Sequence, residues 1–228
     1  MRERPILTID GPSGAGKTTV SRRLAERAAL TRLDTGAMYR ACALAAQRAG
    51  IPWSDAAGLG RLCAGLPLEF RRTDGGELAI VLSGEDIGEA IRTPEISMGA
   101  SEVSAHRQVR EAMVALQRKM GERGGVVLEG RDTGTVVFPD AEAKFFLDAH
   151  AVVRAMRRFR EWGAGRKPFE EVLREVLLRD IQDSTREHSP LRMAEGAIYI
   201  DTTTHSVEEV VEEMLLRLPE SVRRATSP

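Results

Sequence analysis

The sequence predicts an α/β protein in which helices cover both faces of a central parallel sheet. Two observations lead to this prediction. Short, apolar, β-rich runs alternate with helical segments along the 228 residues, and the first such run precedes a glycine-rich turn. Strands that alternate with helices favour parallel pairing, because each helix returns the chain to the same edge of the sheet. A chain of this length accommodates one domain, or one domain with an insert.

The five predicted strands of this sheet are short and largely apolar, and the predicted helices carry apolar side chains every three or four residues. The helix after the first strand illustrates the spacing with Val20, Leu24 and Ala28. The strands are predicted at 6–10, 30–33, 126–128, 144–147 and 197–200. The helices are predicted at 17–29, 37–48, 109–120, 152–161, 169–183 and 207–218, with a further helix from Pro94 and a frayed tail at 219–228.

The segment 66–91 differs from this pattern. Leu66, Leu68 and Phe70 alternate with more polar neighbours, a turn signal follows at 73–76, and a second apolar run occupies 77–82. This pattern predicts a small antiparallel sheet inserted into the α/β chain.

Composition excludes several classes of protein. Lys+Arg is 33 and Asp+Glu is 34, a net charge of −1, so no global basic surface for nucleic acid is expected. No apolar run reaches the roughly 18 to 20 residues that a membrane span needs, and the charged N-terminus does not resemble a signal peptide. Cys42 and Cys63 indicate buried or free thiols in a reducing compartment. We therefore expect a cytoplasmic protein without membrane or nucleic-acid partners.

One motif lies between the first strand and the first helix. It reads Gly11-Pro12-Ser13-Gly14-Ala15-Gly16-Lys17-Thr18 and matches G-x-x-x-x-G-K-[ST]. Glycines let successive backbone N–H groups point at phosphate oxygens, and the helix N-terminus adds partial positive charge. Lys17 would bridge the β- and γ-phosphates, and the Thr18 hydroxyl would hold Mg²⁺. The motif predicts an ATP site over 11–19, including Thr19.

Residues outside the motif show which classes of nucleotide-binding protein remain possible. A switch GTPase needs Asn-Lys-x-Asp, which none of the four lysines supplies. The strand at 126–128 ends in Glu129, so a small ATPase or a nucleotide-binding module stays open.

Arginines favour transfer to a second phosphorylated substrate. Arg40 follows the second strand, Arg131 follows the third, and Arg154, Arg157 and Arg158 share one face of a later helix. This helix is predicted to be a mobile lid that brings guanidinium groups to the transferred phosphoryl group, with 163, 165 and 168 as its hinge. The alternative is a solvated basic helix face.

Several blocks together resemble the cytidylate kinase family of P-loop nucleoside-monophosphate kinases. The most specific is Gly130-Arg131-Asp132-Thr133-Gly134-Thr135-Val136-Val137-Phe138-Pro139-Asp140-Ala141. The others are 9–17, 34–40, 84–87, 91–93 and 179–191, and the resemblance spans about residues 6 to 216. One departure is Glu129, where Asp is expected in several relatives, which would alter how Mg²⁺ or its water shell is held.

This resemblance implies the P-loop NTPase fold in a single domain, 1–228, with a monophosphate-binding insert at about 36–104 and a lid at about 150–168. It implies a monomer that transfers the γ-phosphate of ATP to CMP or dCMP, with Mg²⁺. Lys17, Arg131 and the three lid arginines are then the catalytic residues. The implied acceptor residues are Thr35, Arg40, Arg131 and Arg186 at the phosphate, Ser101, Arg110 and Asp132 at cytosine, and Arg179 and Asp183 at the sugar.

The chemistry of cytosine agrees with these roles. Its N4 amino group suits an accepting carboxylate at Asp132, and its acceptors N3 and O2 suit a guanidinium at Arg110. Uracil would leave buried groups mispaired at roughly 1–3 kcal/mol each. Each assignment has a structural alternative. Asp34 or Thr35 could cap a helix, Ser101 and Arg110 could be ordinary helix residues, Arg131 and Asp132 could pair with each other, and Arg179, Asp183 and Arg186 could form a salt-bridged helix face.

Overall fold

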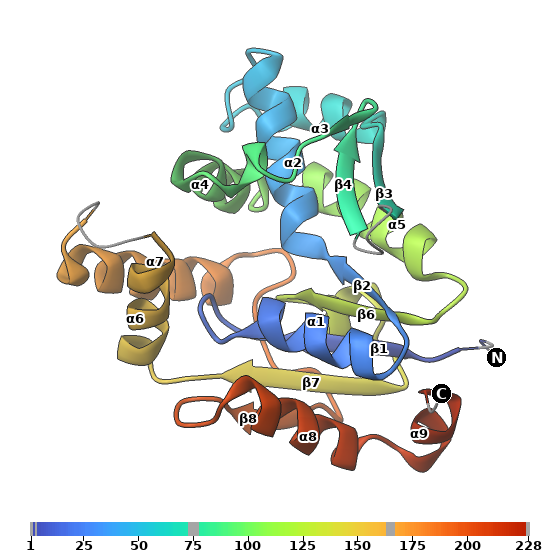
Figure 1. The fold of residues 1–228 in the computed structure, drawn as a ribbon. Helices are drawn as coiled ribbons and strands as arrows, with labels where there is room; N and C mark the ends of the chain where they lie inside the picture. The colour runs from blue at the N-terminus through green and yellow to red at the C-terminus, as the bar shows by residue number, and fades with distance from the viewer. Residues whose placement is uncertain (1, 3, 73–77, 163–166, 227–228) are drawn as a thin grey trace. The chain divides into compact units, whose positions relative to one another are not determined.

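The computed structural model describes residues 2, 4–72, 78–162 and 167–226, and the chain divides into two compact units. One unit combines Met1–Leu33 with Gly121–Pro228, and the other is Asp34–Met120 (Figure 1). The turn predicted at 73–76 and the hinge glycines at 163 and 165 lie outside the described residues. Within the described part of the chain, no helix is long and apolar enough to cross a bilayer.

The first unit is built on a five-stranded sheet in the order β2-β6-β1-β7-β8. The pairs β1–β6, β1–β7 and β7–β8 are parallel, which confirms the predicted architecture. The central strand β1 is buried along its whole length, so the residues that follow it start from a rigid position. The strands are β1 Ile6–Asp10, β2 Thr31–Asp34, β6 Val126–Gly130, β7 Ala143–Asp148 and β8 Ile198–Asp201.

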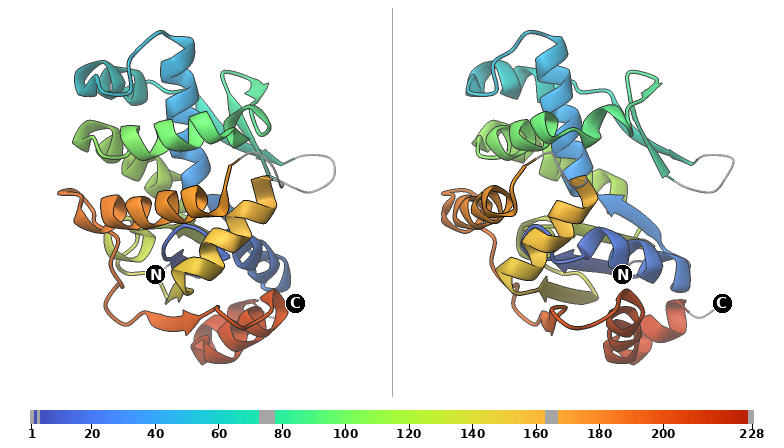
Figure 2. Two further views of the ribbon diagram at one scale, coloured as in Figure 1. Left: turned by 90° about the vertical axis from the view of Figure 1, so that its left-hand side faces the viewer. Right: turned by 60° about the vertical axis from the view of Figure 1, so that its left-hand side comes forward.

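Helices pack against this sheet and against each other. Helix α1 contacts β6 and α8, and α6 packs against α7 around Ala155, Val172 and Val176 (Figure 2). The tail was expected to fray, but it forms α9, because Val222 is buried in the main core of the unit. The helices are α1 Lys17–Arg27, α6 Ala151–Trp162, α7 Phe169–Thr185, α8 Val207–Arg217 and α9 Glu220–Thr226.

The second unit packs helices α3 and α4 against α2, with a three-stranded sheet. That sheet, β3-β4-β5, is antiparallel, as predicted. Helix α3 was not predicted, because its sequence contains two glycines; Asp55 caps it by accepting a hydrogen bond from Gly58 N at 2.9 Å. The elements are α2 Thr35–Arg48, α3 Ala56–Ala64, β3 Leu68–Arg72, β4 Leu78–Leu82, β5 Glu85–Asp86, α4 Pro94–Val103 and α5 Arg107–Gly121.

Candidate active site

The glycine-rich motif forms the loop between β1 and α1. Gly14 and Gly16 have φ of 79° and 88°, which residues with a side chain rarely adopt. A Cβ atom at Gly11 would lie 1.9 Å from the carbonyl oxygen of Leu147, so only glycine fits there. The loop ends at the N-terminus of α1, whose N-cap residue, Gly16, has no side chain to cap it. Backbone N–H groups at such a terminus favour a bound phosphate.

The lysine of the loop is held inside the protein. Lys17 is only 7% exposed, and its Nζ donates a hydrogen bond to the carbonyl oxygen of Pro12 at 2.6 Å. Burial, followed by the nearby charge of Arg131, lowers the pKa of Lys17 well below its ordinary value. A bound polyphosphate would supply the missing negative charge and favour the protonated amine. The electrostatics of this position therefore suit an anion beside Lys17.

The residue after Lys17 belongs to a chain of polar contacts that crosses to β6. Thr18 Oγ1 donates to Glu129 Oε2 at 3.0 Å, and Arg32 Nη1 donates to Glu129 Oε1 at 2.5 Å. A hydroxyl beside a carboxylate is a set of hard oxygen donors of the kind that Mg²⁺ prefers, so the residues present fit this ion. Among the described residues, no group of three acidic, histidine or cysteine side chains could hold a metal.

Arg154, the first of the three predicted lid arginines on α6, is buried and joins three parts of the unit. Its guanidinium makes a bidentate pair with Asp180 of α7, with N–O distances of 3.0 and 2.6 Å. The same group donates to the carbonyl oxygens of Ser13, at 3.2 Å, and Ala149, at 2.8 Å. These contacts join the phosphate loop, α6 and α7.

The other two predicted lid arginines also reach the phosphate loop. Arg157 donates to the carbonyl oxygens of Gly14, at 3.2 Å, and Thr202, at 2.6 Å. Arg158 donates to Ser13 Oγ at 3.0 Å. All three predicted lid arginines therefore lie beside the loop that would hold the triphosphate, although their catalytic role stays a prediction.

A cluster of charged side chains follows β6 and continues on α7. Arg131 Nε donates to Asp183 Oδ2 at 2.8 Å, and nitrogen atoms of Arg179 and Arg186 lie 4.0 and 3.7 Å from the same carboxylate. Arg186 Nη2 also lies 3.8 Å from Asp132 Oδ1. Burial by itself would raise the pKa of Asp183, but the guanidinium charges, that of Arg131 above all, hold it below its ordinary value. Five residues predicted from the sequence are thus together in one unit.

The second unit holds the other predicted acceptor residues. Asp34 caps α2 by accepting from Ala37 N at 2.8 Å, and Arg40 Nη2 lies 3.1 Å from Asp34 Oδ2. Of the two caps that the sequence left open, the structure therefore uses Asp34; Thr35 follows it and is buried.

Two further predicted residues come from α4 and α5. Ser101 is half-buried on α4. Arg110 of α5 is buried, donates to the carbonyl oxygen of Ser104 at 3.2 Å, and lies over the Tyr39 ring at 5.4 Å. Arg110 is therefore held by packing and is not a solvated helix charge.

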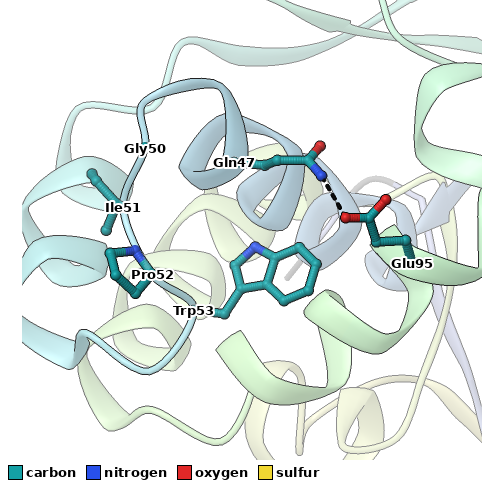
Figure 3. Close-up of a pocket in the computed structure, with 6 residues that line it drawn as sticks. All are labelled: Gln47, Gly50, Ile51, Pro52, Trp53 and Glu95. Atoms are coloured by element: carbon teal, nitrogen blue, oxygen red, sulfur yellow. Dashed lines mark hydrogen bonds between the residues drawn. The ribbon is translucent and has the colours of Figure 1, made fainter.

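A pocket in the same unit lies near the C-terminal end of α2. In Figure 3, Gln47 and Glu95 are joined by a hydrogen bond of 2.8 Å, and the Trp53 indole lies beside them. The indole N–H donates to the carbonyl oxygen of Ala43. The lining is Gln47, Gly50, Ile51, Pro52, Trp53 and Glu95, which includes no residue predicted for the site.

Sequence reasoning missed several residues that hold the predicted ones. Asp10 contacts the turn that follows Asp132, and Arg32 contacts Glu129. Tyr39 lies against Arg110, and Asp180 pairs with Arg154. For Asp10, the available signal was an acidic side chain at the end of a buried strand directly before the glycine-rich loop. No local pattern marks the other three, because their partners are distant in the chain.

A parallel sheet whose central strand leads into this loop, with the half-buried Arg131 directly after the neighbouring strand β6, defines a P-loop phosphotransferase. The model of one family, described as cytidylate kinase, matches residues 7–220. The chain belongs to the cytidylate kinase family, which confirms the resemblance seen in its motifs.

Known proteins place the chain in the same group. It is 54% identical to a cytidylate kinase from Syntrophotalea carbinolica, over 94% of this chain and 92% of the relative. It is 53% identical to a cytidylate kinase from Geobacter sp. strain M21, over 92% of this chain and 90% of the relative. A solved structure of an uncharacterized protein from Eubacterium ventriosum shares the fold, with a TM-score of 0.51 and 12% identity over 94% of this chain and 98% of the other.

Proposed function

We propose that this protein transfers the γ-phosphoryl group of ATP to CMP or dCMP, which yields CDP or dCDP and ADP. One observation carries the proposal: Arg131, held by Asp183 at 2.8 Å, and the adjacent Asp132 follow the strand that pairs with β1, which leads into the phosphate loop. A phosphate-binding cation and a base-reading carboxylate are thus adjacent in the chain. The proposal includes action as a monomer in the cytoplasm.

The ATP side of the reaction rests on residues 11–19. The backbone N–H groups of the loop and the Lys17 amine would bind the β- and γ-phosphates. Thr18, with Glu129 beside its hydroxyl, would hold Mg²⁺. When bound, this ion neutralises phosphate charge. Arg154, Arg157 and Arg158 are proposed to stabilise the charge that develops on the transferred group, and their contacts with Ser13 and Gly14 support this.

The acceptor side rests on the cluster after β6. Arg131 and Arg186 would bind the phosphate of CMP, and Asp183 with Arg179 would hold the sugar. Asp132 would accept a hydrogen bond from the N4 amino group of cytosine. In the second unit, Thr35, Arg40, Ser101 and Arg110 keep the acceptor roles that the family resemblance implies. Uracil carries an oxygen in place of the amino group, so it would face the Asp132 carboxylate with an acceptor.

The reaction needs no general base. The attacking oxygen belongs to the CMP phosphate, which is already ionised at neutral pH. It bonds to the γ-phosphorus as the bond to the β-γ bridging oxygen breaks, and ADP leaves with that electron pair. The protein then contributes positioning and charge neutralisation, which the arrangement of arginines around the loop supports.

The test is ADP release from ATP and Mg²⁺, with CMP, dCMP, UMP, AMP and shikimate offered separately. We expect the fastest release with CMP or dCMP and much slower release with UMP or AMP. Equal or faster turnover with AMP or shikimate would show a related kinase with another acceptor. ADP release at the same rate with no acceptor would show an ATPase, and no release with any acceptor would show a binding module.

A further inference from the structure

The segment after Asp132 is a short π-helical turn, Thr133–Val137. Val137 N donates to the carbonyl oxygen of Asp132 at 3.2 Å, and Phe138 N donates to that of Thr133 at 2.8 Å. The first N–H groups of any helical turn need acceptors from outside it. An aspartate at the N-cap normally supplies one through its own side chain, but Asp132, which occupies this position, makes no such bond.

Asp10, the last residue of β1, accepts these hydrogen bonds. Its Oδ1 accepts from Thr133 N at 2.9 Å and from Thr133 Oγ1 at 2.8 Å, and its Oδ2 accepts from Gly134 N at 2.7 Å. The side chain is buried, and a Cβ atom at Gly134 would lie 2.8 Å from Thr8 Oγ1. Glycine at 134 therefore permits the approach of strand and turn.

We propose that Asp10 is a positioning residue for the acceptor site: it caps the turn in place of Asp132 and so fixes the backbone that carries Arg131 and Asp132. With the N–H groups satisfied by Asp10, the Asp132 carboxylate faces the Arg186 guanidinium at 3.8 Å instead of its own helix. Gly11 follows Asp10 directly, so one strand end anchors both the phosphate loop and the acceptor-side turn. The inference deepens the proposed function and rests on it for the role of Asp132.

Burying the Asp10 carboxylate costs free energy, and this cost supports a role for Asp10 beyond packing. Asp10 lies in the interior, and none of the residues that the structure describes forms an ion pair with it. Burial raises its pKa to about 6 despite the three hydrogen bonds, which lower it. A neutral side chain of similar size would avoid this cost if the position served only the core. An ionised carboxylate can accept from all three donors at once, which an amide cannot.

The test is Asp10→Asn, which places the NH₂ group of the new amide against an N–H donor of the turn, so that two donors face each other. We expect the KM for CMP to rise about 10-fold or more, as for one lost hydrogen bond to a charged group. The KM for ATP changes much less, and the ratio of kcat/KM for CMP to that for UMP shrinks. The control is Val211→Ala, which truncates a buried side chain on α8. It lowers stability but leaves the KM for CMP and the CMP/UMP ratio unchanged.

A milder change keeps the inference testable if Asp10→Asn does not fold. Thr133→Val removes only the hydroxyl donor to Asp10, so it should raise the KM for CMP in the same direction by a smaller factor. If both variants alter this KM no more than Val211→Ala does, Asp10 serves stability alone and the inference is overturned.

The double variant Asp10→Asn/Asp132→Ala separates the inference from the proposed function. If Asp10 acts through Asp132, the double variant has the same CMP/UMP ratio as Asp132→Ala alone. If instead the two substitutions each reduce this ratio and their effects multiply in the double variant, the inference is overturned. If Asp132→Ala itself keeps the wild-type ratio, the base-reading role of Asp132 fails. The rise in the KM for CMP in Asp10→Asn and Thr133→Val, compared with Val211→Ala, then still decides whether Asp10 positions the turn.

Discussion

The Nε atom of Arg131, directly after β6, donates a hydrogen bond to Oδ2 of Asp183 on α7 at 2.8 Å. This bond holds the Arg131 guanidinium from α7, so its position is set by α7 as well as by the chain that follows β6. Arg179 and Arg186 share the same carboxylate, and Asp132 lies beside Arg186. Three positive and two negative side chains therefore meet, and a bound phosphate would balance the remaining positive charge.

Lys17→Ala tests the phosphate loop. We expect kcat to fall by about 10²-fold or more, because the loop loses the charge aimed at the transferred phosphoryl group. The thermal midpoint should not fall, because the buried amine donates to a loop carbonyl and its burial disfavours the charged form. Steady-state kinetics and thermal unfolding check both parts. Activity within about threefold of wild type would contradict the assignment.

Asp132→Ala tests base recognition. Loss of one charged hydrogen bond costs roughly 1.5–3 kcal/mol, or about 10- to 150-fold in kcat/KM for CMP. The effect should fall mainly on KM, because the contact exists in both the ground and the transition state. UMP should be affected less, so the CMP/UMP ratio should shrink. Asp140→Ala is a matched control at an exposed aspartate. An unchanged ratio in Asp132→Ala would leave Asp132 with a structural role near Arg186.

Arg157→Ala tests the arginines of α6. We expect turnover to fall by a similar factor with CMP and UMP, because this side chain contacts the phosphate loop at Gly14 and not the acceptor cluster. Arg160→Ala is the control, since Arg160 is an exposed arginine on the same helix. Rates for both variants with both acceptors give the answer. A selective loss with only one acceptor would place Arg157 in acceptor recognition.

The pH dependence of stability should reveal Asp10. Its pKa in the folded protein is about 6, above the 3.8 expected when unfolded, so the folded chain binds more protons between these values. The free energy of unfolding therefore decreases as pH rises through this window, and the contribution of Asp10 falls by about 2–3 kcal/mol between pH 4 and 7.

Asp10→Asn removes this titration. Urea unfolding at pH 4 and at pH 7 should show the wild type losing about 2–3 kcal/mol relative to the variant. Val211→Ala, by comparison, should lower stability equally at both pH values. A constant difference between wild type and Asp10→Asn would mean that Asp10 does not titrate in this window.

Local pattern was sufficient for most elements of the central sheet. The run at 6–10 became β1 without a change of boundary, and the helix predicted at 169–183 became α7, two residues longer. Predictions failed where a weak local signal was outweighed by packing. Helix α3 forms around buried Leu59 despite its glycines, and α9 is held by buried Val222. The two-residue strand β5 was not predicted, because it is too short to show alternation.

The phosphate loop and the family were determined by the sequence itself, because both depend on residues that are close together in the chain. Glycines, Lys17 and Thr18 act within one turn, and Arg131 with Asp132 forms a contiguous block. The partners of these residues were decided only by the tertiary structure. Asp10 caps a turn 123 residues away in the chain, because parallel pairing of β1 with β6 brings those two strand ends together. No spacing rule along a chain encodes such a contact, since it forms only after the sheet has assembled.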